Sequence, residues 1–212
     1  MCNHFRLGRA RSIYCILPPH MLTEIAKNGS PQQRSHAIDT LSADHSFRQF
    51  RAVQAATLAP KRVAAMPAAT APSAHRTIYT ANQTETLPGT AARAEGAPKS
   101  NDPCVDEAYD GLGATFEFYL EIYHRNSIDN AGMPLLGTVH YGNNYDNAFW
   151  NSQQMVFGGG DGTLFNRFTI ALDVIGHELT HGVTEHTAQL AYSGQPGALN
   201  ESVSDVFGSL IK

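Results

Sequence analysis

Two histidines and two glutamates in the last quarter of the sequence have the types and spacing that metal chemistry needs. Residues 174–183 read VIGHELTHGV, in which His177 and His181 stand four positions apart. On a helix these positions share one face, so both imidazoles could bind a single metal ion. Glu178 is rotated from His177 by about 100°, where it reaches a metal-bound water more readily than the metal. A catalytic zinc ion needs three protein ligands and one open position, and Glu201 is the candidate third ligand.

The elements that must position these residues are two helices. Ile175, Leu179 and Val183 recur at every fourth position and would anchor a helix over 167–185 in a core. A Gly- and Pro-containing loop at 193–197 then separates this helix from a last one over 198–211. The alternative interpretation of the motif is a pair of solvent-facing histidines on an ordinary helix.

Helical and strand patterns both occur upstream of the motif, and we interpret the metal-binding part of the chain as an α+β domain. The pattern at 105–125 predicts a long helix, and the Gly-rich stretch at 158–163 predicts a tight turn without the Lys of a nucleotide-binding loop. Residues 82–101 are polar and rich in Gly and Pro, and we expect a loop there. Strands are expected at 76–81, 135–141 and 154–157, and short helices at 20–28 and from 30 toward 51.

The chain divides into a basic front and an acidic remainder. Residues 1–51 carry a net charge of +4, residues 52–100 of +3 and residues 101–212 of −11. We expect the basic part to be attracted to the acidic part in cis rather than to nucleic acid, because its charges are sparse and unclustered. An Ala-, Pro- and Thr-rich segment at 52–75 predicts a flexible linker, which would be open to proteolytic nicking.

Several classes of protein are disfavoured by composition. No apolar run approaches 18 residues, so we expect no membrane span. The apolar run at 12–17 is too short for a convincing secretory signal. The three cysteines, Cys2, Cys15 and Cys104, do not suggest a disulfide framework or a zinc finger.

Several motifs occurring in the right order resemble the thermolysin-like neutral metalloproteases. They are HELTH at 177–181, ESVSD at 201–205 and NAFW at 147–150, and the likeness extends over residues 104–212. Residues 15–22, CILPPHML, resemble the short pro-region of the protealysin-like branch. The resemblance implies a pro-region over 1–51, a linker over 52–75 and an incomplete N-terminal catalytic domain over 76–212. The chain would then be a fragment of a secreted zinc metalloendopeptidase precursor that lacks the C-terminal helical domain of the family.

The resemblance also implies roles for individual residues. Glu178 would be the general base that takes a proton from a zinc-activated water and passes it to the leaving amine. Asp205 would hold the ring of His177 in the ligating tautomer, and Asn200 would play a similar supporting part. The zinc ligands would be His177, His181 and Glu201.

Further residues match positions of the family that contact substrate or a second metal. Asn147 and Ala148 match an edge strand that pairs with peptide substrate. Tyr192 matches a tyrosine that donates to the tetrahedral intermediate, with a loop tyrosine that only packs as the alternative. Asp173 matches a calcium ligand, although calcium is doubtful because most of its other ligands would lie beyond residue 212. Cys15 could block the metal site as a switch, or be a small buried residue.

The resemblance implies protein or peptide substrates and the chain's own pro-region as partners, with no nucleic acid and no membrane. The last helix would expose the face that meets the missing domain. Two other functions remain open. A truncated, non-catalytic zinc-binding protein could hold or inhibit a partner. A zinc aminopeptidase would share the His-Glu motif but needs an exopeptidase motif that the sequence does not contain.

Overall fold

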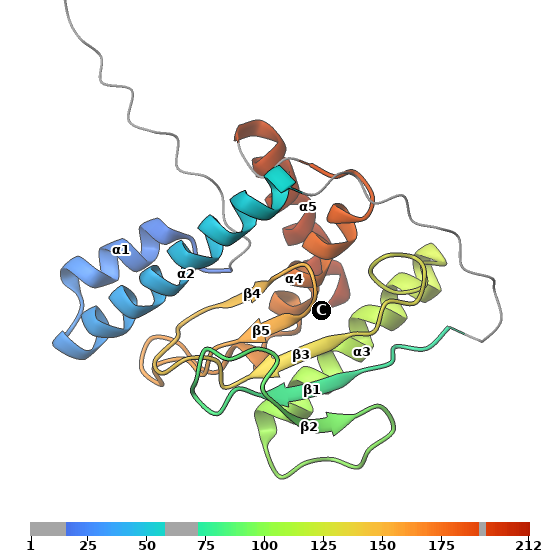
Figure 1. The fold of residues 1–212 in the computed structure, drawn as a ribbon, viewed down its shortest axis with the longest axis horizontal. Coiled ribbons are helices and arrows are strands. Elements are labelled where there is room, and N and C mark those ends of the chain that lie inside the picture. Colours follow the sequence, from blue (N-terminus) through green and yellow to red (C-terminus); the bar gives the residue numbers. More distant parts are fainter. Residues whose placement is uncertain (1–15, 58–71, 191–193) are drawn as a thin grey trace, which may run out of the picture.

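A mixed five-stranded sheet forms the centre of the computed structural model, which describes residues 16–57, 72–190 and 194–212 (Figure 1). Its strand order is β2-β1-β3-β5-β4, so β4 lies at one edge. Strand β1 pairs antiparallel with β2 and parallel with β3, β3 runs parallel to β5, and β4 returns antiparallel to β5. The strands are β1 (Thr77–Thr80), β2 (Thr90–Ala94), β3 (Leu136–Val139), β4 (Ala148–Trp150) and β5 (Met155–Phe157).

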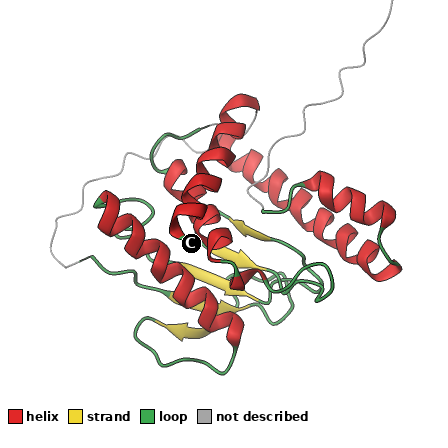
Figure 2. Cartoon of the chain, turned by 180° about the vertical axis from the view of Figure 1, so that it is seen from behind, coloured by secondary structure: helices red, strands yellow, loops and turns green. Residues whose placement is uncertain are grey.

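Two helices, α3 (Pro103–Tyr123) and α4 (Leu172–Glu185), cover one face of this sheet, as both ribbon views show (Figures 1 and 2). Helix α3 begins at Pro103, and the carboxylate of Asp102 caps it by accepting from the Cys104 amide at 2.9 Å. The core between helices and sheet is apolar and includes the fully buried Leu112, Phe157, Ile175 and Leu179. This packing fixes α4, and with it the His-Glu motif, against the sheet.

Helix α5 (Gly194–Ile211) packs along α4, and their backbones approach closely at two glycines. A Cβ atom added at Gly176 would lie 3.2 Å from the Gly208 Cα and 2.8 Å from Ile211. A Cβ at Gly208 would lie 2.6 Å from the carbonyl oxygen of Asp173. Since real side chains do not approach backbone so closely, the two helices depend on these glycines for their separation.

The front of the chain forms a helical hairpin beside the β4 edge (Figure 1). Helix α1 (Pro19–Asn28) buries Leu22, and helix α2 (Pro31–Thr57) buries Ala37. Helix α2 continues to Thr57 and so extends into the segment 52–75 predicted as a linker. Residues 58–71 lie outside the described part of the chain.

The sequence-based elements and the observed ones agree in most places and differ in four. Helix α2 runs into the predicted linker, and helix α5 begins at Gly194, inside the loop predicted at 193–197. Strand β2 lies inside the stretch 82–101 that was predicted to be a loop, because its backbone pairs with β1 although its side chains are mostly exposed. The helix predicted from 167 begins only at Leu172, after a short 3₁₀ turn (η1, Phe168–Ile170). Arg167 and Thr169 bond to Glu107 of α3, which holds this turn away from the axis of α4.

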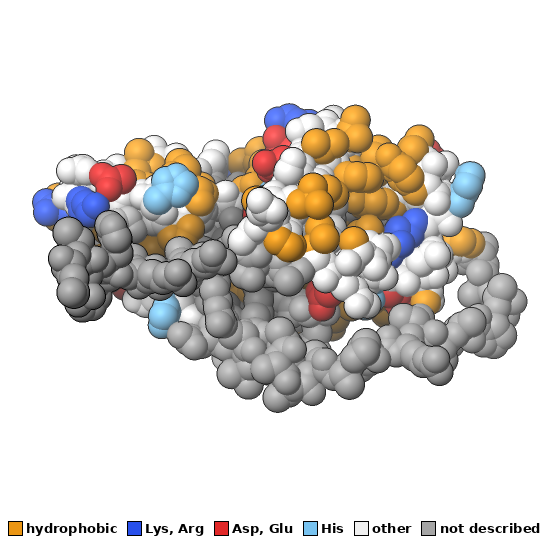
Figure 3. All heavy atoms as spheres, turned by 90° about the horizontal axis from the view of Figure 1, so that it is seen from above, with side chains coloured by type: hydrophobic (Ala, Val, Ile, Leu, Met, Phe, Trp, Pro, Cys, Tyr) orange, Lys and Arg blue, Asp and Glu red, His pale blue; other side chains and the backbone are white. Residues whose placement is uncertain are grey.

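Large hydrophobic side chains are exposed on the described helices, and hydrophobic atoms gather on the face seen in Figure 3. On α5 the exposed fractions are 54% for Leu199, 54% for Val206 and 58% for Leu210, so the last helix does expose an apolar face as expected. Among the described residues, no helix is both long enough and apolar enough to cross a membrane.

Candidate metal centre

Helices α4 and α5 bring three candidate ligand atoms together at their interface. The Nε2 atoms of His177 and His181 lie 3.0 Å apart, and the Glu201 Oε2 lies 3.3 Å from the first and 3.7 Å from the second. His181 is fully buried, His177 is 4% exposed, and the Glu201 side chain is 31% exposed. Two imidazole nitrogens and one carboxylate oxygen, converging from one partly open side, form the donor set of a catalytic zinc site. The donors that the chain offers here therefore fit zinc.

Polar residues of α5 contact the Nδ1 atom of each imidazole ring, while the Nε2 atoms face the candidate metal position. The Asn200 Oδ1 lies 2.8 Å from the His181 Nδ1, and the Asp205 Oδ1 lies 2.9 Å from the His177 Nδ1. The Asn200 oxygen can accept from the His181 Nδ1, so this nitrogen carries the proton and the His181 Nε2 presents its lone pair. The Asp205 carboxylate pairs with the His177 Nδ1 by charge, without the geometry of a hydrogen bond. Burial lowers the pKa of His177, but the carboxylates of Glu201, Glu178 and Asp205 outweigh it and leave this pKa raised. The same negative surroundings favour a cation at the two Nε2 atoms.

Ser204 is a neighbour of His181 that the sequence analysis did not identify. Its Oγ lies 2.9 Å from the His181 Nδ1, on the same side of the ring as Asn200. The spacing of Ser204 could have identified it as a neighbour of His181, because Ser204 follows Asn200 by four positions and so shares its helix face.

Glu178 is fully buried beneath the edge strand of the sheet. Its Oε2 accepts a hydrogen bond of 3.0 Å from the backbone amide of Trp150 on β4. The indole Nε1 of Trp150 donates in turn to Glu185 at 3.2 Å. The carboxylate next to the ligands is thus held at the strand that was expected to bind substrate, a link that sequence patterns did not indicate.

The outer edge of β4, which is buried, is in contact with the first described residues of the chain. The Ile16 amide donates to the Ala148 carbonyl at 3.4 Å. The side chain of Asn147 accepts from the Leu17 amide at 3.0 Å and donates to its carbonyl at 3.3 Å. Asn147 and Ala148, predicted as substrate-binding residues, therefore contact Ile16 and Leu17 of this same chain.

Other predicted site residues are placed elsewhere or are not described. Tyr192 and Cys15 lie outside the described residues. The carboxylate of Asp173, at the start of α4, forms an ion pair with the Lys212 ammonium at 2.9 Å. That ammonium stands beside the carboxylate for which the resemblance implies calcium, and calcium binding by Asp173 stays a prediction.

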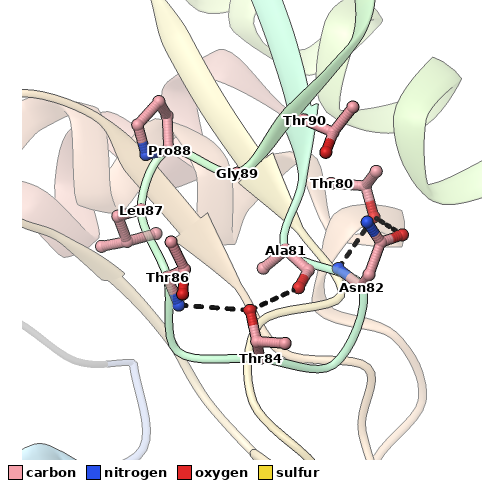
Figure 4. A pocket seen from close by; sticks show the side chains of 9 residues that line it. All are labelled: Thr80, Ala81, Asn82, Thr84, Thr86, Leu87, Pro88, Gly89 and Thr90. Atoms are coloured by element: carbon pink, nitrogen blue, oxygen red, sulfur yellow. Dashed lines mark hydrogen bonds between the residues drawn. The ribbon is translucent and has the colours of Figure 1, made fainter.

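A hollow of about 420 Å³ lies near the β2 edge of the sheet, opposite to β4, and does not coincide with the candidate metal centre (Figure 4). It is lined by the loop that joins β1 to β2, and none of the lining residues is a predicted site residue. The Thr84 hydroxyl bonds to the Ala81 carbonyl and accepts from the Thr86 amide, so the polar groups of this loop bond to one another. Because the convergent ligands and carboxylates lie elsewhere, we assign the chemistry to the α4–α5 interface.

Sequence and structure comparisons place these features in a known family. The family described as "Thermolysin metallopeptidase, catalytic domain" matches residues 30–185, and its "alpha-helical domain" matches residues 188–212. The match therefore divides the range 76–212, which the sequence analysis treats as one domain, between two domains of the family.

Similar proteins are longer than this chain. An "Extracellular metalloprotease" of Pectobacterium carotovorum subsp. carotovorum is 51% identical and is aligned over 96% of this chain and 56% of its own length. "Protease PrtS" of Photorhabdus sp. (strain Az29) is 46% identical over 93% of this chain and 52% of its own. The solved precursor of protealysin, a metalloproteinase from Serratia proteamaculans, is 49% identical, with a TM-score of 0.78 over 93% of this chain and 54% of its own. The chain thus spans about half the length of these relatives. By the extent of these matches, it belongs to the thermolysin metallopeptidase family.

Proposed function

We propose that this chain is part of the precursor of a secreted zinc-dependent metalloendopeptidase. The observation that carries the proposal is the convergence of His177, His181 and Glu201 beside a buried glutamate. Family membership supports a protease, and the description of one relative as extracellular supports secretion. Zinc, when held by these three side chains, supplies Lewis-acid chemistry that lowers the pKa of water to near neutrality.

The chain's own residues would do the remaining chemistry. Glu178 accepts a proton at its carboxylate and delivers it to the leaving amine. Its Oε2 is fixed by the Trp150 amide, which keeps the carboxylate aligned with the substrate strand. Asp205 and Asn200 keep the two imidazoles in the ligating tautomer.

Peptide substrate would bind along β4, with Asn147 and Ala148 offering a side-chain amide and a backbone carbonyl. The contacts of Ile16 and Leu17 with these two residues support an inhibited precursor, because the segment occupies the groups that substrate would use. Removal of the pro-region would then free the strand. Tyr192 is proposed, by family likeness, as a donor to the reacting carbonyl.

The test combines zinc content, measured by mass spectrometry, with hydrolysis of casein. We expect zinc at His177, His181 and Glu201 in the chain and in Glu178→Gln. Once the segment ahead of β1 has been removed, we expect hydrolysis in every protein except that variant. Glu185→Gln, two turns further along α4, is the matched control and should keep both properties. Absence of zinc, or equal hydrolysis by Glu178→Gln, would contradict the mechanism. Zinc without hydrolysis in any of these proteins would favour a non-catalytic zinc-binding protein.

A further inference from the structure

One face of helix α2 is polar and buried, which is unusual for a helix at the edge of a domain. His36, Thr40 and Asp44 stand one turn apart and are 7%, 0% and 0% exposed. They face the segment Tyr145–Asn147, which leads into β4. Buried polar groups are costly unless they are paired, so each turn of this face should have a partner.

The second and third turns of this face are well paired. The Thr40 hydroxyl accepts from the Asp146 amide at 2.9 Å. The carboxylate of Asp44 accepts from the Tyr145 hydroxyl at 2.7 Å and from the Asn147 side chain at 3.1 Å. These bonds fasten α2 to the strand that is expected to bind substrate.

The first turn of this face is not paired in the same way. The His36 Nδ1 lies 3.8 Å from the Asp146 Oδ2, which is beyond hydrogen-bond distance. Their side chains are 9% and 5% exposed, and among the described residues neither the His36 Nδ1 nor the Asp146 Oδ1 has a hydrogen-bond partner. Asp161 contributes a third donor, and one ligand atom from each residue lies within 4.8 Å of the others.

Two carboxylates lie close together at this cluster, and that of Asp161 accepts hydrogen bonds from the backbone of 163–165 and from the Thr163 hydroxyl. Burial, reinforced by the negative charge of Asp161, raises the pKa of Asp146 to about 7. Although burial acts to raise it, the pKa of Asp161 is lowered to about 2 by bonds from the Phe165 amide and from Thr163. One ligand atom of each of these two carboxylates and of the imidazole lies within 4.8 Å of the others, so a cation held between them would offset the repulsion of the carboxylates.

We propose that His36, Asp146 and Asp161 form a second binding site for a divalent transition-metal ion, which fastens the pro-region helix to the catalytic part of the chain. One imidazole nitrogen and two carboxylate oxygens suit Zn²⁺ or Mn²⁺ better than Ca²⁺, which takes six to eight oxygen ligands. Two ligand atoms bound to one zinc ion at about 2.1 Å lie at most about 4.2 Å apart. The observed 3.8 Å is within that limit, whereas it is too long for a direct bond.

This site is independent of the proposed catalytic centre, because it shares no residue with it and joins different elements. Its role would be to hold the precursor closed. Chelation would then loosen α2 from the Tyr145–Asn147 segment, even in a chain whose catalytic ligands are disabled.

Zinc stoichiometry, measured by equilibrium dialysis and mass spectrometry, tests the proposal. We expect two zinc ions per chain, one zinc ion in His36→Ala and two in His45→Ala, whose exposed histidine lies on the same helix. Glu201→Gln should lose the other ion, so a failure of the catalytic centre is distinguishable from a failure of this site. One ion in the unmodified chain with Glu201 intact, or a second ion that survives His36→Ala, would overturn the proposal.

A second measurement keeps the proposal falsifiable if His36→Ala does not fold by circular dichroism. Crystals of the unmodified chain grown with zinc would be examined by anomalous diffraction at the zinc edge. A peak bonded to the His36 Nδ1 and to a carboxylate of Asp146 or Asp161 supports the site. No peak at that position overturns it.

Discussion

Substituting Gly208 by Ala should separate helices α4 and α5 and weaken zinc binding without replacing a ligand. The added Cβ would lie 2.6 Å from the Asp173 carbonyl oxygen and 3.1 Å from the His177 amide nitrogen. Ordinary van der Waals contact begins at 3.4 Å, so the helices must move apart by about 0.8 Å at this point. The obstacle is backbone, which cannot rotate away as a flexible side chain can.

Two opposing terms set the size of the effect of Gly208→Ala. Alanine favours a helix over glycine by roughly 0.5–1 kcal/mol, whereas overpacking costs about 1–3 kcal/mol. Packing should win, and we expect a net loss of about 1–2 kcal/mol in the free energy of unfolding. Metal sites tolerate changes of only about 0.2 Å in ligand distance, so the movement should reduce zinc affinity by about tenfold or more.

Zinc affinity would be measured by competition with a chromophoric chelator, and stability by urea unfolding. Gly159→Ala is the matched control, because Gly159 is exposed and an added Cβ there meets nothing within 4 Å. It should leave both quantities unchanged. If Gly208→Ala binds zinc as tightly as the unmodified chain and is equally or more stable, then the close approach of the helices does not position Glu201.

Three further predictions concern pH and the pro-region. The Arg76 guanidinium holds the pKa of Glu95 down at about 2, although burial acts to raise it. This pair therefore stabilises the fold above pH ~4.5, and its contribution is lost as pH falls toward 2. The midpoint of urea unfolding should therefore fall more between pH 5 and pH 2.5 in the unmodified chain than in Glu95→Gln; equal falls would refute this. Asp44→Ala removes the carboxylate that accepts from the buried Tyr145 hydroxyl, which should cost about 1–3 kcal/mol in the free energy of unfolding. Hydrogen exchange of the α2 amides should become faster. Unchanged exchange would contradict the prediction that this bond holds α2 in place. Leu22→Ala leaves a cavity at a fully buried site of α1 and should cost about 2–5 kcal/mol in the free energy of unfolding. The loss would be measured as reduced protection of the α1 and α2 amides from hydrogen exchange. Unchanged protection would show that the hairpin collapses to fill the space.

The metal centre could be anticipated from the sequence because its geometry is mostly local. His177 and His181 occupy successive turns of one helix, so they share one face, and their Nε2 atoms lie 3.0 Å apart. On a second helix, Glu201 and Asp205 likewise stand one turn apart, and Asn200 directly precedes Glu201. Only the relative placement of the two helices was not local, and it came from family resemblance rather than from spacing.

The features that sequence patterns did not indicate depend on tertiary contacts. Strand β2 has mostly exposed side chains, and its pairing with β1 decides its conformation. The bond between Glu178 and the Trp150 amide joins residues of two elements that only the folded sheet brings together. Gly176 and Gly208 resemble ordinary weak points of a helix until the neighbouring helix is present.

Helix α2 shows most clearly why the same periodicity can be interpreted in two ways. Its apolar residues do not all mark the buried face, because Ile38 is 54% exposed while His36, Thr40 and Asp44 are buried. A polar stripe at every fourth position normally indicates a solvent face. Here it is buried because the opposing segment offers matching donors and acceptors. A buried face made of such groups depends on the charge of its members, so it can be released by changes in protonation or metal binding that would leave an apolar interface intact. That property would suit the pro-region proposed here, which would have to bind firmly in the precursor and later be removed.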